Sequence, residues 1–157
     1  MGEANDKLRK AYNDSWVAGL SNSKNCSGFL KTLARVYAFS LPDAKADGIL
    51  TYLKDSPEWV HLGNGGGGLM AAISAAASGA LVVAGASSAD YGGSDGHVAI
   101  LLPKKAGPHN APLIYGGASN EAARSPGTKT IREVWRPTGH QHLQFYKHPT
   151  IQLGHYD

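Results

Sequence analysis

Apolar residues recur every three or four positions over residues 26–39, which is the pattern of a helix with one buried face. Pro42 ends this segment. Similar spacing predicts an N-terminal helix over residues 5–17 and a second short helix over residues 43–56. Polar residues fill positions 21–25, and we expect residues 18–25 to form a loop.

The pattern changes in the second half of the chain. We expect a flexible glycine-rich loop at residues 63–68 and an alanine-rich helix at residues 69–77. Five runs rich in valine, isoleucine and aromatic residues then predict strands, at residues 80–84, 97–102, 112–117, 130–135 and 142–148. Because their connections are short and without helices, we expect an antiparallel sheet. Helices followed by strands indicate the α+β class.

The bulk properties narrow the classes of protein. The 157 residues are expected to form one domain, residues 1–157. A net charge of +3 without long Lys/Arg runs argues against nucleic-acid binding and suits an anionic substrate or an acidic partner. Residues 69–86 carry no charge but are mostly alanine, glycine and serine, so we predict no membrane span. The N-terminus has no apolar stretch, so we predict no Sec signal.

The chain contains one cysteine, Cys26. A single cysteine excludes an internal disulfide and a zinc site built from several cysteines. A thiol attacks as thiolate, and a helix N-terminus or an adjacent imidazole lowers its usual pKa of about 8.5. Cys26 opens a predicted helix that Asn25 or Ser23 can cap. Ser27 and Gly28 leave room for a substrate, and the backbone N–H of Cys26 is the expected oxyanion donor.

A nucleophilic cysteine needs a base, and the chain has seven histidines. His97 is the best placed, because it opens the predicted strand 97–102 and is expected to point into a cleft at the edge of the sheet. Gly96 leaves room beside it. The other six lie in loops or near the C-terminus: His61, His109, His140, His142, His148 and His155.

Simpler interpretations exist for the same residues. A lone cysteine is more often a buried apolar residue than a nucleophile, and a histidine at a strand edge is usually structural. His140 and His142 would share one face of a strand, a geometry that suits a metal ion. No carboxylate lies near them in the sequence, so we predict neither a metal site nor a cofactor.

Taken together, the two motifs are more specific than either residue. "NCSGFL" at residues 25–30 and "GHVAILL" at residues 96–102 resemble the NlpC-type branch of the papain-like cysteine hydrolases. Within that branch the chain resembles the peptidoglycan amidase effectors of bacterial type VI secretion systems. Three further stretches carry this resemblance: "GALVVAG" (79–85), "APLIYGG" (111–117) and "TIREVWRPTGHQHLQFYKH" (130–148), the last as a closing hairpin.

The resemblance implies a papain-like fold, with N-terminal helices packed on a mainly antiparallel sheet of five to six strands. It implies hydrolysis of peptide stems in peptidoglycan, with Cys26 attacking an amide and His97 acting as base and then as acid. It also implies delivery by the type VI secretion apparatus into the periplasm of a target cell. An immunity protein that occludes the active site would protect the producing cell.

Several points stay open at this stage. The third catalytic group is unresolved between a backbone or water partner and the side chains of Asn110, His109, Tyr115, Asp95 and Asp90. The bond between D-Glu and meso-diaminopimelate is weakly favoured over the cross-link from diaminopimelate to D-Ala. Four basic residues could bind the carboxylates of the peptide stem or could be ordinary solvated charges: Arg124, Lys129, Arg132 and Arg136. The alternatives are a papain-like deamidase or protease acting on a protein, and a non-catalytic cell-wall binding module.

Overall fold

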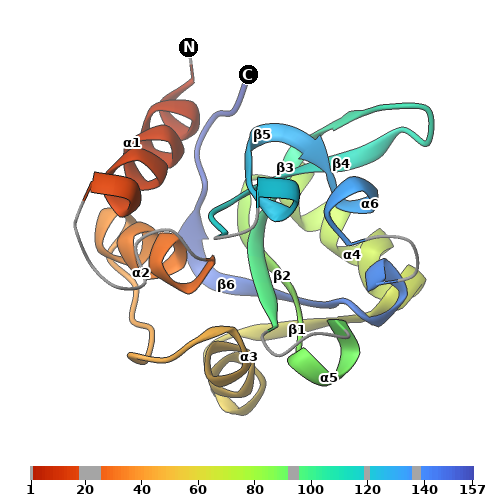
Figure 1. Ribbon diagram of the computed structural model, residues 1–157, viewed down its shortest axis with the longest axis horizontal. Helices are drawn as coiled ribbons and strands as arrows, with labels where there is room; N and C mark the ends of the chain where they lie inside the picture. Colours follow the sequence, from red (N-terminus) through yellow and green to blue (C-terminus); the bar gives the residue numbers. More distant parts are fainter. Residues whose placement is uncertain (1, 18–25, 92–95, 119–120, 136–138) are drawn as a thin grey trace.

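The computed structural model describes residues 2–17, 26–91, 96–118, 121–135 and 139–157. It has an α+β fold, as predicted, with a six-stranded sheet flanked by helices on both faces (Figure 1). The predicted loop at residues 18–25 lies outside the described residues. Within the described part, no helix has both the length and the apolar character needed to cross a bilayer.

The three predicted N-terminal helices are present. They are α1 (Glu3–Val17), α2 (Cys26–Tyr37) and α3 (Ala46–Asp55). The predicted helix 26–39 ends two residues early, because Ala38 adopts a positive φ of 59° and the chain leaves the helical path.

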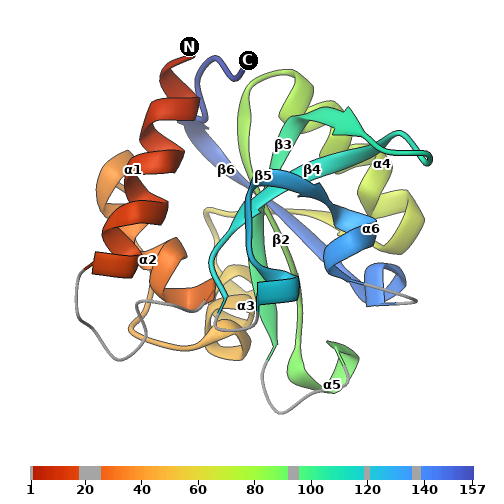
Figure 2. The same cartoon turned by 45° about the horizontal axis from the view of Figure 1, so that its top comes forward.

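All neighbouring strands of the sheet are antiparallel, as predicted. Their spatial order is β1-β6-β2-β3-β4-β5. The strands are β1 (Val60–Asn64), β2 (Ala80–Ala86), β3 (His97–Ala106), β4 (Ala111–Gly116), β5 (Ser125–Thr130) and β6 (Gln144–Gln152). The last strand therefore lies inside the sheet, between the first two, and the two chain ends come close together (Figure 2).

The sheet separates two hydrophobic clusters. Along β3, Val98 and Ile100 belong to the cluster under α1, α2 and α3, whereas Ala99 and Leu101 belong to the cluster under α4 (Gly65–Ala77) and α6 (Ile131–Val134). This alternation is the period of two expected of a strand buried on both faces. Trp135, fully buried, is the largest side chain of the second cluster.

The predicted strand at residues 130–135 is wrong. Thr130 ends β5 and is the N-cap of α6. Its side chain accepts the N–H of Glu133 at 3.3 Å, and the Glu133 carboxylate accepts the N–H of Thr130 at 2.9 Å. This capping box satisfies two backbone donors locally, which outweighs the strand preference of the β-branched residues. The described residues of 130–148 do not form the expected closing hairpin, because β5 pairs with β4 and β6 pairs with β1 and β2.

The predicted glycine-rich loop is also wrong. Residues 63–64 end β1, and residues 65–68 form the first turn of α4, which the sequence placed only from residue 69. Besides α6, the sequence did not predict three further short helical segments of the described chain: α5 (Ser88–Tyr91) and the 3-10 turns η1 (Glu121–Ala123) and η2 (Gly139–His142).

Two neighbouring glycines of α4 are expected to respond oppositely to substitution by alanine. A Cβ on Gly67 would meet nothing within 4 Å, so Gly67→Ala should stabilise the helix by about 0.5–1 kcal/mol. A Cβ on Gly68 would clash with the carbonyl group of Gly63, 2.6 Å from its oxygen, so Gly68→Ala should destabilise by about 1–3 kcal/mol. Urea unfolding of both variants measures the two changes, and equal effects would contradict this packing.

Candidate active site

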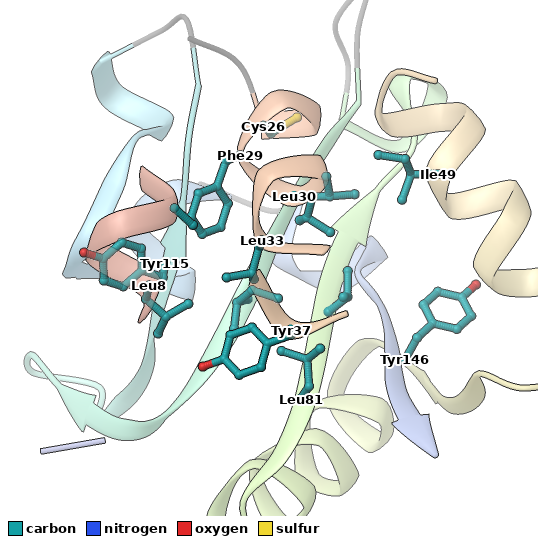
Figure 3. Packing of buried hydrophobic residues seen from close by; sticks show 14 of the residues in the cluster. Leu8, Cys26, Phe29, Leu30, Leu33, Tyr37, Ile49, Leu81, Tyr115 and Tyr146 are labelled. Carbon is teal, nitrogen blue, oxygen red and sulfur yellow. The ribbon is translucent and has the colours of Figure 1, made fainter. Parts of the chain in front are cut away.

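Cys26 lies in the first turn of α2, at one end of the first cluster (Figure 3). The helix is held in place by Phe29, Leu30 and Leu33, all fully buried. Cys26 itself is 8% exposed, so its sulfur lies just beneath the surface. The helix start predicted from the sequence therefore places the thiol at the N-terminal end of a rigid element.

The sulfur of Cys26 lies close to the backbone of Gly96, the residue that precedes His97. Its Sγ is 4.0 Å from the carbonyl oxygen of Gly96, the limit for a weak S–H···O hydrogen bond. Seventy residues of sequence separate these two groups. The structure thus brings the only cysteine and the start of β3 together at one end of the sheet.

His97 is the first residue of β3 and pairs with Ala86 of β2. Its side chain is 3% exposed, so it does not project into open solvent at the sheet edge. The imidazole packs against the indole of Trp135, with ring centroids 5.0 Å apart and planes at 54°. The ring is therefore on the side of the second cluster, while Cys26 belongs to the first.

Burial controls the charge of His97. Desolvation lowers its pKa to about 4, and a hydrogen bond with the backbone of Ala123 in η1 raises it by a smaller amount. The imidazole is therefore neutral at neutral pH. A neutral imidazole whose N–H donates to a backbone carbonyl has its other nitrogen available as a proton acceptor.

Of the side chains considered as a third group, those of His109, Asn110 and Tyr115 are not brought to His97. His109 and Asn110 lie in the turn between β3 and β4, at the opposite end of a ten-residue strand, about 30 Å from His97. The ring of Tyr115 packs on Phe29, 5.9 Å between centroids, in the first cluster. Asp95 and the side chain of Asp90 lie outside the described residues.

Of the basic residues considered for stem carboxylates, Arg124 lies between η1 and β5, Lys129 in β5 and Arg132 in α6. The ammonium of Lys129 donates to the carbonyl of Ala122 at 3.1 Å, next to the residue that binds His97. Arg124 is half-buried and Arg132 is exposed on α6. Arg136 lies outside the described residues.

The proposed strand geometry for a histidine metal pair is wrong. His140 and His142 belong to the 3-10 turn η2 and not to a strand, and the side chain of His140 lies outside the described part. Among the side chains that are described, no group of three or more His, Cys, Asp and Glu is placed to bind a metal.

Sequence reasoning missed two groups near the candidate pair. The backbone of Ala123 has no signature in the sequence, because a carbonyl can be supplied by any residue. Asp47, in the first turn of α3, accepts hydrogen bonds from Ser88 and lies against Gly96. An acidic residue in a first helical turn is common, and nothing in the sequence pairs it with residue 88.

We expect the buried imidazole of His97 to make folding stability depend on pH. In the unfolded chain its pKa is about 6.5, above its folded value of about 4, so the unfolded state binds the proton first. The stabilisation is complete above pH 6.5 and is lost as the pH falls towards 4, by roughly 3 kcal/mol.

Urea unfolding at pH 7 and at pH 4.5 measures how the free energy of unfolding changes with pH, which we call the slope. The variant His97→Gln should retain only the smaller slope due to groups such as His148, whose pKa is also lowered by burial. An undiminished slope in that variant would contradict the assignment to His97.

The α+β fold brings a cysteine in the first turn of a helix next to the residue that precedes a histidine at a strand start, which is consistent with the predicted resemblance to papain-like cysteine hydrolases. The chain is similar to the peptidoglycan amidase Tse1 of Pseudomonas aeruginosa, with 29% identity over 139 residues. That alignment covers 88% of this chain and 84% of Tse1. No protein-family model matches the chain. The similarity to Tse1 confirms the predicted resemblance to peptidoglycan amidases.

Proposed function

We propose that this chain is a single-domain cysteine amidase that hydrolyses peptide stems of bacterial peptidoglycan. The observation that carries the proposal is the contact between the Cys26 sulfur and the carbonyl before His97, 4.0 Å away. The similarity to a peptidoglycan amidase over most of the chain supports the choice of substrate.

The proposed reaction passes through an acyl-enzyme. For this step the imidazole of His97 turns from the indole of Trp135 towards the sulfur and removes the thiol proton as the sulfur of Cys26 attacks the amide carbonyl. The backbone N–H of Cys26, at the start of α2, stabilises the oxyanion. The imidazolium then gives its proton to the leaving amine, and a water molecule, deprotonated by the same imidazole, hydrolyses the thioester to a carboxylic acid and the free thiol.

The backbone of Ala123 takes the orienting role that an acidic side chain has in a triad. Its hydrogen bond with His97 fixes which ring nitrogen carries the proton and leaves the other as the proton acceptor. Burial favours the neutral ring, so the resting enzyme holds an unprotonated imidazole.

The proposal extends to the biological setting implied by the resemblance. The scissile bond is the one between D-Glu and meso-diaminopimelate, in preference to the diaminopimelate–D-Ala cross-link. Delivery is by the type VI secretion apparatus, and the enzyme acts in the periplasm of the target cell. An immunity protein that covers the active site protects the producing cell.

Digestion of purified Gram-negative sacculi, followed by mass spectrometry of the released muropeptides, tests the proposal. Cleavage of the favoured bond releases disaccharide dipeptides and a new diaminopimelate amine, whereas cleavage of the cross-link converts dimers to monomers without shortening stems. Because Cys26 is the only cysteine, protein alkylated with iodoacetamide is a matched single-site control. Intact muropeptides after digestion with unmodified protein would refute the amidase activity.

A further inference from the structure

Asp47 contacts the start of the connection between β2 and β3. Its Oδ1 accepts the backbone N–H of Ser88 at 2.7 Å, and its Oδ2 accepts the Ser88 hydroxyl at 2.5 Å. Ser88 is the first residue of α5 and follows the last residue of β2, Ala86, by two positions. Both oxygens of one carboxylate therefore bind the chain just after it leaves the sheet, through charge-assisted hydrogen bonds.

The same carboxylate lies against the other end of this connection. A Cβ on Gly96 would be 2.5 Å from Oδ1 of Asp47, 2.6 Å from the carbonyl oxygen of Ala86 and 3.1 Å from the backbone nitrogen of Ser88. Gly96 thus has no space for a side chain. Its glycine is needed for this close approach, and not for free space beside His97 as the sequence suggested.

Gly96 therefore lies between two functional groups on two helices. Its Cα faces the carboxylate of Asp47 on α3, and its carbonyl oxygen is 4.0 Å from the sulfur of Cys26 on α2. Helix α3 is a firm support, because Ile49 and Leu53 are almost completely buried in the first cluster.

We propose that Asp47 is a positioning residue, a clamp that holds Ser88 and Gly96 against each other. We call this three-residue contact the junction, and it fixes where His97 enters β3 relative to Cys26. The consequence for turnover rests on the proposed amidase function. Catalysis by a nucleophile and a base needs their separation held to within a fraction of an ångström, and a small displacement costs up to a hundredfold in rate. A freed junction would lower the rate of the chemical step while the substrate still binds.

A purely stabilising role for Asp47 makes a different prediction. Carboxylates in the first turn of a helix interact favourably with the helix dipole. Loss of that interaction would lower the free energy of unfolding but would leave the junction and kcat unchanged in the folded protein.

The test compares Asp47→Ala and Asp47→Asn with the control Asp43→Ala. The control removes the same charge from a nearby exposed aspartate that pairs with Lys31 at 2.8 Å. The measurements are kcat and KM on a soluble stem peptide, and amide hydrogen exchange at Ser88 and His97. For Asp47→Ala we expect kcat to fall about tenfold or more with KM within about twofold, and exchange at both amides to quicken about tenfold.

Asp47→Asn keeps an oxygen acceptor for the Ser88 N–H and should retain most of the turnover. Asp43→Ala should resemble the wild type in all measurements. An unchanged kcat in folded Asp47→Ala, an equal loss in Asp43→Ala, or a loss of kcat without faster exchange at His97 would each overturn the clamp. If the wild type cleaves no stem peptide, the amidase proposal fails, and hydrogen exchange at His97 still decides whether Asp47 holds the junction.

Should Asp47→Ala fail to fold, Ser88→Ala replaces it. This variant removes only the hydroxyl hydrogen bond and leaves the carboxylate and the backbone contact. We expect the same changes in kcat and in exchange at His97, reduced to about threefold. Exchange at His97 equal to that of the wild type would overturn the clamp.

Discussion

Replacement of Cys26 by alanine is expected to abolish the release of peptide products from sacculi. The sulfur is the proposed nucleophile, and enzymes that lose a nucleophile of this kind retain at most about a thousandth of their turnover. The fold should survive, because Cys26 lies at the edge of its cluster, 8% exposed, and alanine is only slightly smaller. Chromatography of digested sacculi measures product release per hour and so gives the turnover of the variant relative to the wild type.

The matched control is Ser27→Ala, which removes the hydroxyl of the buried residue that follows Cys26 and leaves the thiol in place. Thermal unfolding of both variants should show folded proteins with cooperative transitions. Turnover by Cys26→Ala at more than about a tenth of the wild-type rate would remove the sulfur from the mechanism.

The largest loss of stability is expected from Trp135→Ala. The indole is fully buried in the second cluster, so its truncation should cost about 3–5 kcal/mol in the free energy of unfolding. The same change uncovers the imidazole of His97, which packs on the indole at 5.0 Å, and should raise the pKa of His97 from about 4 towards 6.5. Urea unfolding and NMR titration of the imidazole measure the two effects.

Trp135→Phe separates packing from hydrogen bonding. Among the residues that the structure describes, the indole N–H has no hydrogen-bond partner. Substitution by phenylalanine therefore reduces the buried volume without removing a hydrogen bond. We expect a loss of stability well below that of the alanine variant, with the pKa of His97 still depressed. Both variants lack the indole N–H, but only Trp135→Phe keeps an aromatic ring. Equal losses of stability in the two variants would therefore contradict the assignment of the stabilisation to packing.

Local patterns predicted the elements that make up most of the core. The spacing of Phe29, Leu30 and Leu33 defined α2, and runs of apolar residues defined β2, β3 and β4, because burial on both faces requires such runs. Strand β1 was missed because none of its five residues is buried, so it shows no apolar run. At residues 130–135, composition favoured a strand, although Thr130 and Glu133 already had the spacing of a capping box.

The candidate site was predictable only where it depends on side-chain identity at an element boundary. Cys26 and His97 open a helix and a strand, and the sequence shows both boundaries. Neither the hydrogen bond between His97 and the backbone of Ala123 nor the contact of Asp47 with Gly96 could be derived in this way. Both depend on how distant segments pack, and a backbone carbonyl leaves no mark on the sequence.

The place of β6 in the sheet has a consequence for biosynthesis. Strand β1 is paired with β6 alone, and β2 has β6 as one of its two partners, so contacts between residues 59 to 87 positions apart complete the sheet. Such long-range pairing slows folding. A nascent chain that has not yet extended past residue 152 cannot assemble this sheet on the ribosome, so any enzymatic activity must wait until translation has passed that point.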